Sequence, residues 1–194
     1  MGAIHLPSRK PICGKGINDS TVSMSDPSIH DAYYAWFNMI NRCYGSTRRR
    51  AYDGCCVCDE WLLFSNFKKW FDENRRAGCQ IDKDIINGKS RTYSPENCCF
   101  VPARINLVVV GKNLKHDLPC GVTFSKRLGY YYVRLTNGRD VFYLGKYYDK
   151  MEAFQAYKTE KEKYIKEVAL DAFNKGEIDE RTFIALQKFE VNAQ

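Results

Sequence analysis

The spacing of hydrophobic residues changes along the chain, and this change limits the possible folds most strongly. In the N-terminal half, aromatic and aliphatic side chains recur every three or four positions, which predicts two amphipathic helices. One begins after an Asp26-Pro27 or Ser28 cap and ends near Gly45, and the other covers 59–74. In the C-terminal half the alternation has period two, which predicts strands over 121–126, 130–136 and 141–146. We therefore expect an α+β protein.

Turn signals and polar segments divide the chain further. Asn87-Gly88 and Asn137-Gly138 are each typical of a tight hairpin. The first predicts a strand over 81–85, a turn, a second strand and then a helix from Ala103. Further helices are expected from about Lys150 and over 179–190; the apolar set of the former is Met151, Phe154, Tyr157 and Tyr164. The predicted parts are an irregular arm (1–28), a domain (29–110), a linker (111–117), a sheet domain (118–170) and a helical extension (171–194).

Composition and charge narrow the class of protein. Hydrophobic residues make up 44% of the 194 residues and aromatic residues 14%, which is typical of a globular chain rather than a disordered one. No apolar run approaches the ~20 residues of a membrane helix, and no signal peptide is evident, so we expect a cytoplasmic protein without a membrane partner. The net charge is +7, of which +5 lies in 112–167, and this favours an anionic partner.

The chain has nine cysteines, an odd number without an export signal, so a disulfide framework is not expected. Cys55 and Cys58 form a C-x-x-C pair, and with Cys43 and Cys98 they could supply four thiolates to a structural zinc ion. The second C-x-x-C pair of a zinc ribbon is missing. The alternative is that these cysteines are small buried hydrophobic residues.

The region 14–110 resembles the phage HNH-type homing endonucleases. The motifs that carry the resemblance occur in order: GIND at 16–19, YAWFNMINRCY at 34–44, VCDEW at 57–61, IDKDI at 81–85, YSPENC at 93–98 and then Asn106. The resemblance implies a ββα-metal fold that binds one Mg²⁺ or Mn²⁺ ion. By position, Asp82 would be the first ligand, Asn97 the middle asparagine that orients the loop, and Asn106 the ligand on the helix. Carboxylate and amide oxygens are hard donors that suit such ions.

The sequence departs from this family at the general base. The family usually has a histidine next to the aspartate, and this chain has Lys83; its histidines are His5, His30 and His116. A lysine with a pKa near ~10.4 is a poor base at neutral pH, so Asp84 or a metal-activated water would have to replace it. An alternative is that Asp82 and Asp84 only brace a turn.

The region 118–168 resembles the APETALA-two/ethylene-response-factor DNA-binding module. The matching residues are Gly121-Val122, Gly129-Tyr130, YVRL at 132–135, YLGKY at 143–147 and Glu152-Ala153-Phe154 with Ala156-Tyr157. The resemblance implies a three-stranded antiparallel sheet, packed on one helix, that enters the major groove of double-stranded DNA. The plant module has more arginines on this face.

Alternation along the strands predicts which side chains contact DNA. Tyr131, Val133, Leu135, Phe142 and Leu144 should pack on the helix, and Val141 should face outward with the DNA-contacting residues. These are Thr123, Ser125, Lys126, Arg127, Tyr130, Tyr132, Arg134, Thr136, Tyr143 and Lys146. The alternative is a small solvated sheet with a basic rim.

Two functions follow from these patterns. The first is a site-specific DNA endonuclease of the homing type, acting in the host cytoplasm if it is encoded by a phage. The second is a DNA-binding or regulatory protein that keeps a degenerate HNH site and does not cleave. A third, weaker alternative is a structural or host-takeover protein whose cysteine centre serves only protein contacts. The patterns specify neither an oligomeric state nor a target sequence.

Overall fold

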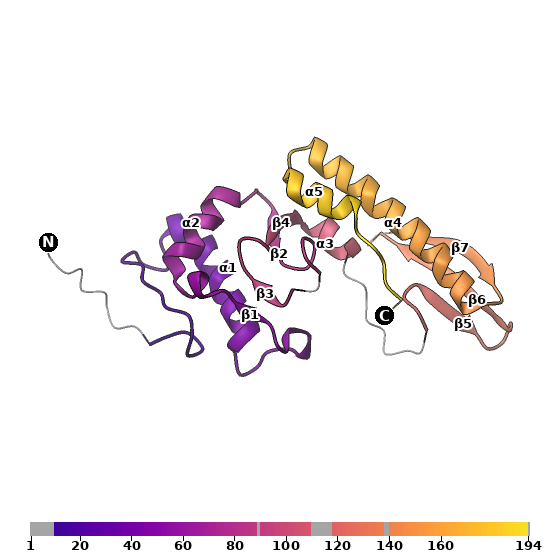
Figure 1. Ribbon diagram of the computed structural model, residues 1–194, viewed down its shortest axis with the longest axis horizontal. Helices are drawn as coiled ribbons and strands as arrows, with labels where there is room; N and C mark the ends of the chain where they lie inside the picture. The colour runs from indigo at the N-terminus through magenta and orange to yellow at the C-terminus, as the bar shows by residue number, and fades with distance from the viewer. Residues whose placement is uncertain (1–9, 89, 110–117, 138–139, 194) are drawn as a thin grey trace, which may run out of the picture. The chain divides into compact units, whose positions relative to one another are not determined.

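The computed structural model describes residues 10–88, 90–109, 118–137 and 140–193 (Figure 1). The protein is a mixed α+β structure, as the two hydrophobic periods predict. It forms two compact units, one of Met1–Arg76 with Ile81–Phe100 and one of Ala77–Gln80 with Val101–Gln194. The chain therefore changes units between Phe100 and Val101; the predicted linker 111–117 lies outside the described residues. No helix in the described part of the chain is long and apolar enough to span a bilayer.

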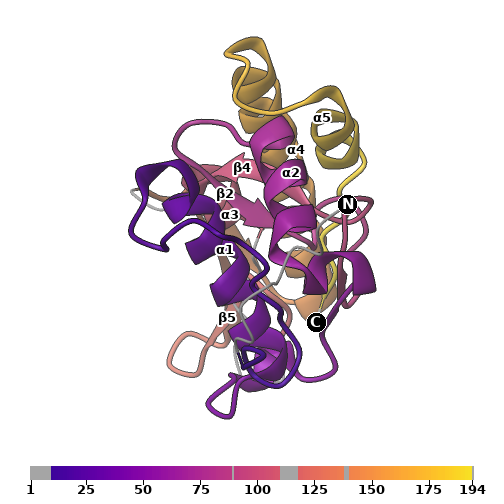
Figure 2. The same ribbon diagram turned by 90° about the vertical axis from the view of Figure 1, so that its left-hand side faces the viewer.

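In the first unit, two helices pack side by side through aromatic residues: α1 (Pro27–Tyr44) and α2 (Phe64–Asn74) (Figure 2). Trp36 of α1 and Trp61, in the short helix η2 (Asp59–Leu62), are fully buried. The Trp36 indole N–H donates to the Trp61 carbonyl oxygen at 2.7 Å, so the polar atom of the buried ring is satisfied. The aromatic residues that the sequence places on one face of each helix are thus the core of this unit.

An aspartate carboxylate caps the N-terminus of each of these two helices, but the two aspartates lie at different places in the chain. The Asp26 carboxylate accepts the Ser28 N–H at 2.8 Å and caps α1. The residue before α2 is Leu63, which makes no side-chain cap, and Asp19 from the N-terminal arm does this instead. Its carboxylate accepts the backbone N–H and the hydroxyl of Ser65, at 2.9 and 2.5 Å. In the described part of the predicted arm, residues 10–26 are irregular, and residues 17–19 lie against the start of α2.

The strands between 56 and 102 do not pair as the sequence predicts. β1 (Cys56–Val57) pairs in parallel with β3 (Thr92–Tyr93), and β2 (Cys79–Asp82) pairs with β4 (Cys99–Pro102). The predicted hairpin at Asn87-Gly88 is wrong, because the strands on either side of it belong to different sheets. All four residues of β4 are buried, which makes β4 the more apolar partner for β2. The helix expected from Ala103 is confirmed as α3 (Ala103–Val109), directly after β4.

The second unit contains an antiparallel sheet in the order β5-β6-β7, with α4 (Lys150–Asn174) across one face (Figure 1). β5 is Val122–Ser125, β6 is Tyr130–Thr136 and β7 is Val141–Tyr147. The core between sheet and helix contains Val122, Val133, Leu135, Ala153, Phe154 and Tyr157. The predicted hairpin between β6 and β7 is confirmed, because the two strands are antiparallel neighbours on either side of residues 137–140. The ends of this loop are joined by the Asp140 N–H, which donates to the Asn137 side-chain oxygen at 2.7 Å; Gly138 lies outside the described residues.

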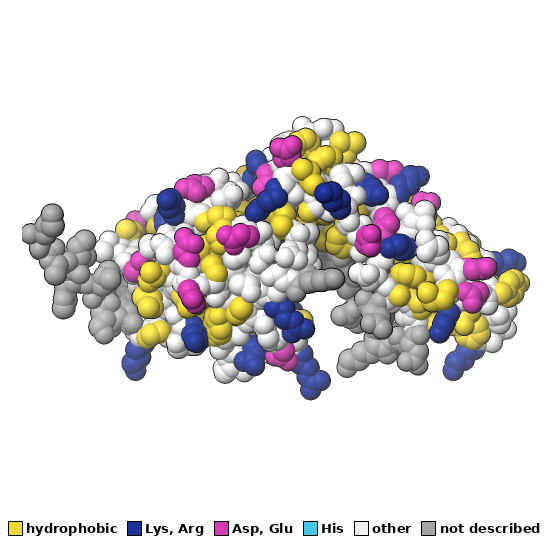
Figure 3. All heavy atoms as spheres, viewed as in Figure 1, with side chains coloured by type: hydrophobic (Ala, Val, Ile, Leu, Met, Phe, Trp, Pro, Cys, Tyr) yellow, Lys and Arg dark blue, Asp and Glu magenta, His cyan; other side chains and the backbone are white. Residues whose placement is uncertain are grey.

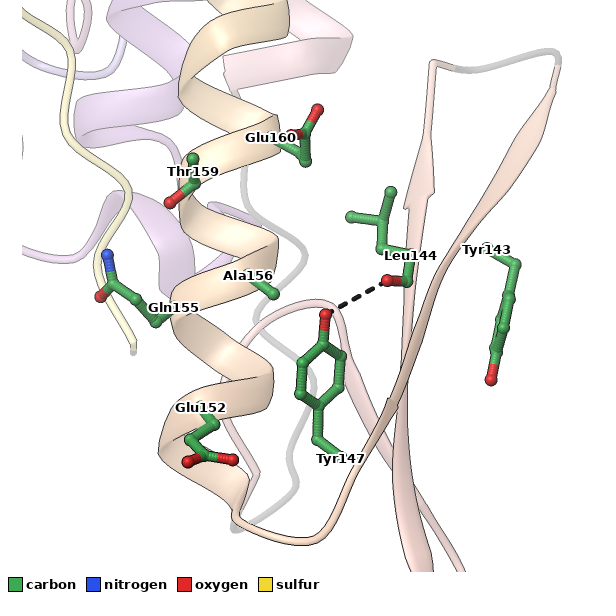
Figure 4. A pocket seen from close by; sticks show the side chains of 8 residues that line it. All are labelled: Tyr143, Leu144, Tyr147, Glu152, Gln155, Ala156, Thr159 and Glu160. Atoms are coloured by element: carbon green, nitrogen blue, oxygen red, sulfur yellow. Dashed lines mark hydrogen bonds between the residues drawn. The ribbon is translucent and has the colours of Figure 1, made fainter.

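β7 contains an irregularity, and one of its side chains departs from the predicted packing. Val133 pairs with Gly145 and Arg134 with Tyr143, so Leu144 is an extra residue in the β7 strand. In Figure 4, Leu144 and Tyr147 lie on the α4 side of β7, and Tyr143 lies on the other side. Phe142, predicted to pack on the helix, is 46% exposed, although its cross-strand partner Leu135 belongs to the core. Met151, in the first turn of α4, is also exposed and not part of the core.

The C-terminal residues return along α4. The helix α5 (Glu180–Gln187) packs on the second half of α4, and Asp179 caps it through the Thr182 N–H at 2.7 Å. After α5, the Val191 N–H donates to Glu162 at 2.8 Å and its carbonyl oxygen accepts from Lys158 at 3.2 Å. Val191 then packs against the core of the sheet. The predicted helical extension is therefore part of the second unit.

We expect Gly121→Ala to destabilise the protein far more than Gly129→Ala. Both glycines have positive φ angles, +77° and +68°, so alanine costs about 1–2 kcal/mol at either position. A Cβ atom at Gly121 would also overlap the Tyr157 ring, whereas nothing lies within 4 Å of one at Gly129. Urea denaturation should give a total loss of roughly 2–4 kcal/mol for Gly121→Ala. Equal losses in the two variants would contradict the close approach of Gly121 to α4.

Candidate nucleic-acid interface and metal site

The outer face of the sheet, opposite α4, brings the predicted DNA-binding residues together. Thr123 and Ser125 of β5 pair with Tyr132 and Tyr130 of β6, so these four share a face. On the other side of β6, Tyr132 pairs with Lys146, Arg134 with Tyr143, and Thr136 with Val141. Lys126 and Arg127 lie in the turn between β5 and β6, beside this face. We call this set the outer sheet face.

The outer sheet face combines exposed aromatic rings with positive charge. The Arg134 guanidinium lies 5.1 Å from the centroid of the Tyr132 ring, and Tyr143 is 61% exposed. Arg134, Lys126, Arg127 and Lys146 are exposed, and Tyr130 and Tyr132 are half-buried. No residue of β5, β6 or β7 is acidic. The face therefore presents guanidinium and ammonium groups beside flat rings, without carboxylates that would repel phosphate.

Carboxylates instead of cations lie on the side of β7 that faces α4. A cavity of about 650 Å³ lies between β7 and α4, lined by Leu144 and Tyr147 and by the carboxylates Glu152 and Glu160 (Figure 4). The Tyr147 hydroxyl donates to the Leu144 carbonyl oxygen at 3.2 Å across its edge. No lysine or arginine lines it. A cavity lined by carboxylates and a face that carries cations therefore lie on opposite sides of β7.

Asp82 ends β2 and is the predicted metal ligand in the first unit. Its Oδ1 atom accepts the backbone N–H groups of Asp84 at 2.7 Å and Ile85 at 2.9 Å, so it does brace the turn. Within the described part of the chain, no group hydrogen-bonds to its Oδ2 atom. Burial raises the pKa of the carboxyl above its usual range, against the two hydrogen bonds that lower it. One oxygen of a desolvated carboxylate is therefore available to a cation.

Lys83, at the position of the usual histidine base, is turned inward. Its side chain is 9% exposed, and its Nζ atom lies 2.5 Å from the Asp84 carboxylate, whose side chain is 61% exposed. Nζ also lies 5.8 Å from the centroid of the Tyr93 ring. Burial alone would lower the pKa of Lys83, but the hydrogen bond and charge of Asp84 raise it above the usual value. Lys83 therefore forms an ion pair with Asp84 from a buried position.

The two predicted asparagines have different environments. The Asn97 side-chain amide donates to the Ser90 hydroxyl at 2.8 Å and to the Thr92 carbonyl oxygen at 3.0 Å, and so holds the loop 90–97. In the second unit, Asn106 lies on α3. Its side-chain oxygen is buried and has no hydrogen-bond partner among the described residues. An unpartnered buried amide oxygen is costly, and coordination of a cation would satisfy it.

The donor types of Asp82 and Asn106 fit a magnesium ion, since both offer hard oxygens and Mg²⁺ keeps most of its own waters. Asp82 belongs to the first unit and Asn106 to the second. Among the described residues, no group of three or more His, Cys, Asp or Glu side chains is placed to hold a metal. The structure therefore offers single donors rather than an all-protein cage.

The four cysteines of the predicted zinc site all belong to the first unit. Cys43, Cys55 and Cys98 are buried and Cys58 is half-buried. Burial raises the pKa of the Cys43 thiol to about 12, with Cys55 as a neighbouring charge, and raises that of Cys98, with Cys58 among its neighbours. Burial thus favours the protonated form of the Cys43 and Cys98 thiols in the absence of metal.

Compared with known proteins, the chain matches no family model, no curated protein and no solved structure. The likeness to the two families therefore rests on the motifs of the sequence.

Contacts of Arg42 and Arg91 were missed by the sequence analysis. Arg42 lies 5.7 Å from the centroid of the Tyr52 ring, and Arg91 donates to the Asp53 carbonyl oxygen. Burial raises the pKa of Tyr93, and Arg42 lowers it. The one available signal was the run of three arginines at 48–50, to which no function was assigned. The partners Tyr93 and Arg91 are about 40 residues further along the chain, and no local pattern links them to the run.

We expect Asp82→Asn to raise the melting temperature at pH 7 in EDTA, and Asp82→Ala to lower it. Asparagine keeps an acceptor for the Asp84 and Ile85 N–H groups and removes a buried charge. Alanine leaves both N–H groups without this acceptor, which costs about 1–2 kcal/mol of folding stability. Because the folded-state pKa of Asp82 is raised, the wild type loses stability as the pH rises from the usual value of 3.8 through that higher pKa. The advantage of Asp82→Asn should therefore vanish at lower pH. A lower melting temperature for Asp82→Asn at pH 7 would contradict the burial of this carboxylate.

The zinc prediction is tested by metal analysis. If Cys43, Cys55, Cys58 and Cys98 bind zinc, chelator-washed protein should retain about one zinc per chain, and each serine variant should lose it. Cys120→Ser, at a half-buried cysteine of the second unit, is the control and should retain the metal. A zinc-free protein with an unchanged melting temperature would make these four ordinary core residues.

Proposed function

We propose that this protein is a DNA endonuclease of the homing type, in which an HNH-like ββα-metal site cleaves and the sheet binds double-stranded DNA. The observation that carries the proposal is the outer sheet face. It collects Arg134, Lys146 and three tyrosines on one surface, without a carboxylate in the strands. Lysine and arginine neutralise phosphates, and arginine can also bind a guanine edge in the major groove.

Binding through this face has a physical basis in the register of the strands. Arg134 is supported by the Tyr132 ring, so its guanidinium loses less freedom when it binds than a free side chain would. Thr123, Ser125 and Thr136 add hydroxyl groups that hydrogen-bond phosphate or base edges. The core on the opposite side of β6 fixes the strand, so the face is held in place before DNA arrives.

The cleaving half of the proposal rests on Asp82 and Asn106. In it, Asp82 provides the charged ligand and Asn106 the amide ligand of one Mg²⁺ or Mn²⁺ ion, and Asn97 holds the loop between them in sequence. When bound, such an ion polarises a phosphate and lowers the pKa of its water. The order of β2, β4 and α3 supports the ββα-metal fold, as does the unpartnered oxygen of Asn106.

A DNA-binding protein that does not cleave is the second candidate, and the environment of Lys83 favours it. The family's general base is usually a histidine, and this position holds Lys83. The Lys83 side chain is buried, and its amine forms an ion pair with the exposed Asp84 carboxylate. Only Asp84 offers an exposed carboxylate there. If Asp84 is the base, Asp84→Asn should reduce cleavage much more than Lys83→Ala.

Cleavage and binding should respond to different substitutions. We expect the full-length protein to cut phage or host DNA only with Mg²⁺ or Mn²⁺ and not with EDTA. Asp82→Ala and Asn106→Ala should slow cleavage by roughly 100-fold or more, since each removes a proposed ligand, and should leave DNA affinity unchanged. Arg134→Ala should weaken DNA binding by about tenfold. Asp59→Ala, an exposed acid of the same unit as Asp82, is the control for lost charge.

Gel assays of cleavage and fluorescence anisotropy of labelled duplexes measure the two effects separately. Cleavage at an unchanged rate in Asp82→Ala would refute the site assignment. Absence of cleavage by the wild type on several DNAs with both metals, with binding retained, would favour the second candidate. Absence of DNA binding by the wild type would refute both.

A further inference from the structure

The loop between α1 and β1 carries a concentration of arginines that the proposed function does not use. Arg48, Arg49 and Arg50 are exposed, and the short helix η1 (Arg50–Tyr52) lies within this loop. Figure 3 shows Lys and Arg side chains gathered at the edge of the first unit where this loop lies. Three consecutive guanidinium groups repel one another, so their exposure favours an anionic partner.

Two further arginines join this loop from other parts of the first unit. Arg42, on the last turn of α1, lies over the Tyr52 ring, and Arg91, next to β3, donates to the Asp53 carbonyl oxygen. We call Arg42, Arg48, Arg49, Arg50 and Arg91 the arginine surface. Its geometry is fixed by folding, because α1, η1 and the start of β3 each contribute to it.

The charge of the arginine surface is largely uncompensated. Asp53 forms an ion pair with Arg48 at 3.2 Å, so the five arginines and this one aspartate leave a balance of +4. In the described part of the chain, Arg49 and Arg50 have no ion-pair partner. Two other cations of the same unit are paired: Lys68 binds Asp72, and Arg75 binds Asp31, both at 2.5 Å.

Contacts connect the arginine surface to the predicted cleavage site within the same unit. Arg42 is near enough to Tyr93 to act on the pKa of its hydroxyl, which burial raises and Arg42 lowers, and the ring of Tyr93 lies 5.8 Å from the Nζ atom of Lys83. Lys83 follows Asp82 directly in the chain. Tyr93 thus links Arg42 to Lys83, in the turn that follows Asp82. An anionic chain bound along the arginines would lie close to that turn.

We propose that the arginine surface binds the phosphate backbone of double-stranded DNA next to the cleavage site, as a second contact separate from the outer sheet face. The inference rests on the proposed function, because it names the substrate contact of the same site. Guanidinium groups suit this role, since each can bind two phosphate oxygens and stays charged at any physiological pH. Contacts to phosphates carry no base information, so binding through these arginines should depend little on sequence.

The salt dependence of DNA affinity tests the proposal in the full-length protein. Each phosphate contact contributes about 0.9 to the slope of log affinity against log salt. Arg48→Ala/Arg49→Ala/Arg50→Ala should therefore make the slope shallower by roughly 2 to 3. The control Lys163→Ala/Lys166→Ala/Lys188→Ala removes the same charge from exposed positions of the second unit and should change the slope by less than about 1. Because Arg48 pairs with Asp53, the variant Arg49→Gln/Arg50→Gln is added, which breaks no contact and should lose roughly 2.

The outcomes separate this inference from the proposed function. Wild-type binding that Arg134→Ala weakens, with an unchanged slope in both arginine variants, would overturn the arginine surface and leave the DNA-binding sheet intact. If the lysine control lost as much of the slope, the effect would depend on net charge alone, and this outcome would also overturn the arginine surface. Tighter binding of duplex RNA than of DNA, lost in the arginine variants, would reassign the surface. No binding by the wild type would refute the proposed function itself.

Discussion

The pleat of β6 is the constraint on which the C-terminal unit depends, because this one strand supplies both the core and the outer sheet face. Val133 and Leu135 are buried against α4, and Tyr132 and Arg134 alternate with them on the other side. A slip of one residue would bury Arg134 and expose Val133, so the hydrophobic core fixes the register. The position of the proposed DNA contacts is therefore a consequence of packing rather than of the contacts themselves.

Much of the fold could be predicted because its elements are specified locally. The helical period gives α1 and α2, and the period of two gives β5, β6 and β7, since each places a hydrophobic face on a core. Pairings between distant segments could not be predicted this way. The Asn87-Gly88 signal is local and predicts that β2 pairs with the strand directly after the turn. β2 pairs instead with the buried strand β4, which begins 17 residues beyond Asp82. The extra residue Leu144 likewise depends on the cross-strand partners of β7 and has no signature of its own.

The candidate site shows the same division. The outer sheet face could be assigned from alternation alone, and the register of the strands places its members together. The inward orientation of Lys83 could not be predicted, because it depends on contacts of its amine with the Tyr93 ring and the Asp84 carboxylate. Folding brings the Tyr93 ring to the Lys83 amine. The unpartnered oxygen of Asn106 is also invisible in the sequence, since an asparagine on a helix usually finds water or a neighbour. Burial, rather than residue type, distinguishes these two positions.

Asp82 and Asn106 share a property that hydrophobic packing does not explain. Asp82 keeps a carboxylate in a desolvated turn, and Asn106 keeps a buried oxygen without a donor. Each arrangement costs about 1–3 kcal/mol relative to a satisfied group, which is a large part of the 5–15 kcal/mol that stabilises a typical domain. Glycine or alanine on α3 would avoid the cost at Asn106. Oxygens held at such a cost are the ones that a divalent cation would satisfy, and this supports their assignment as ligands.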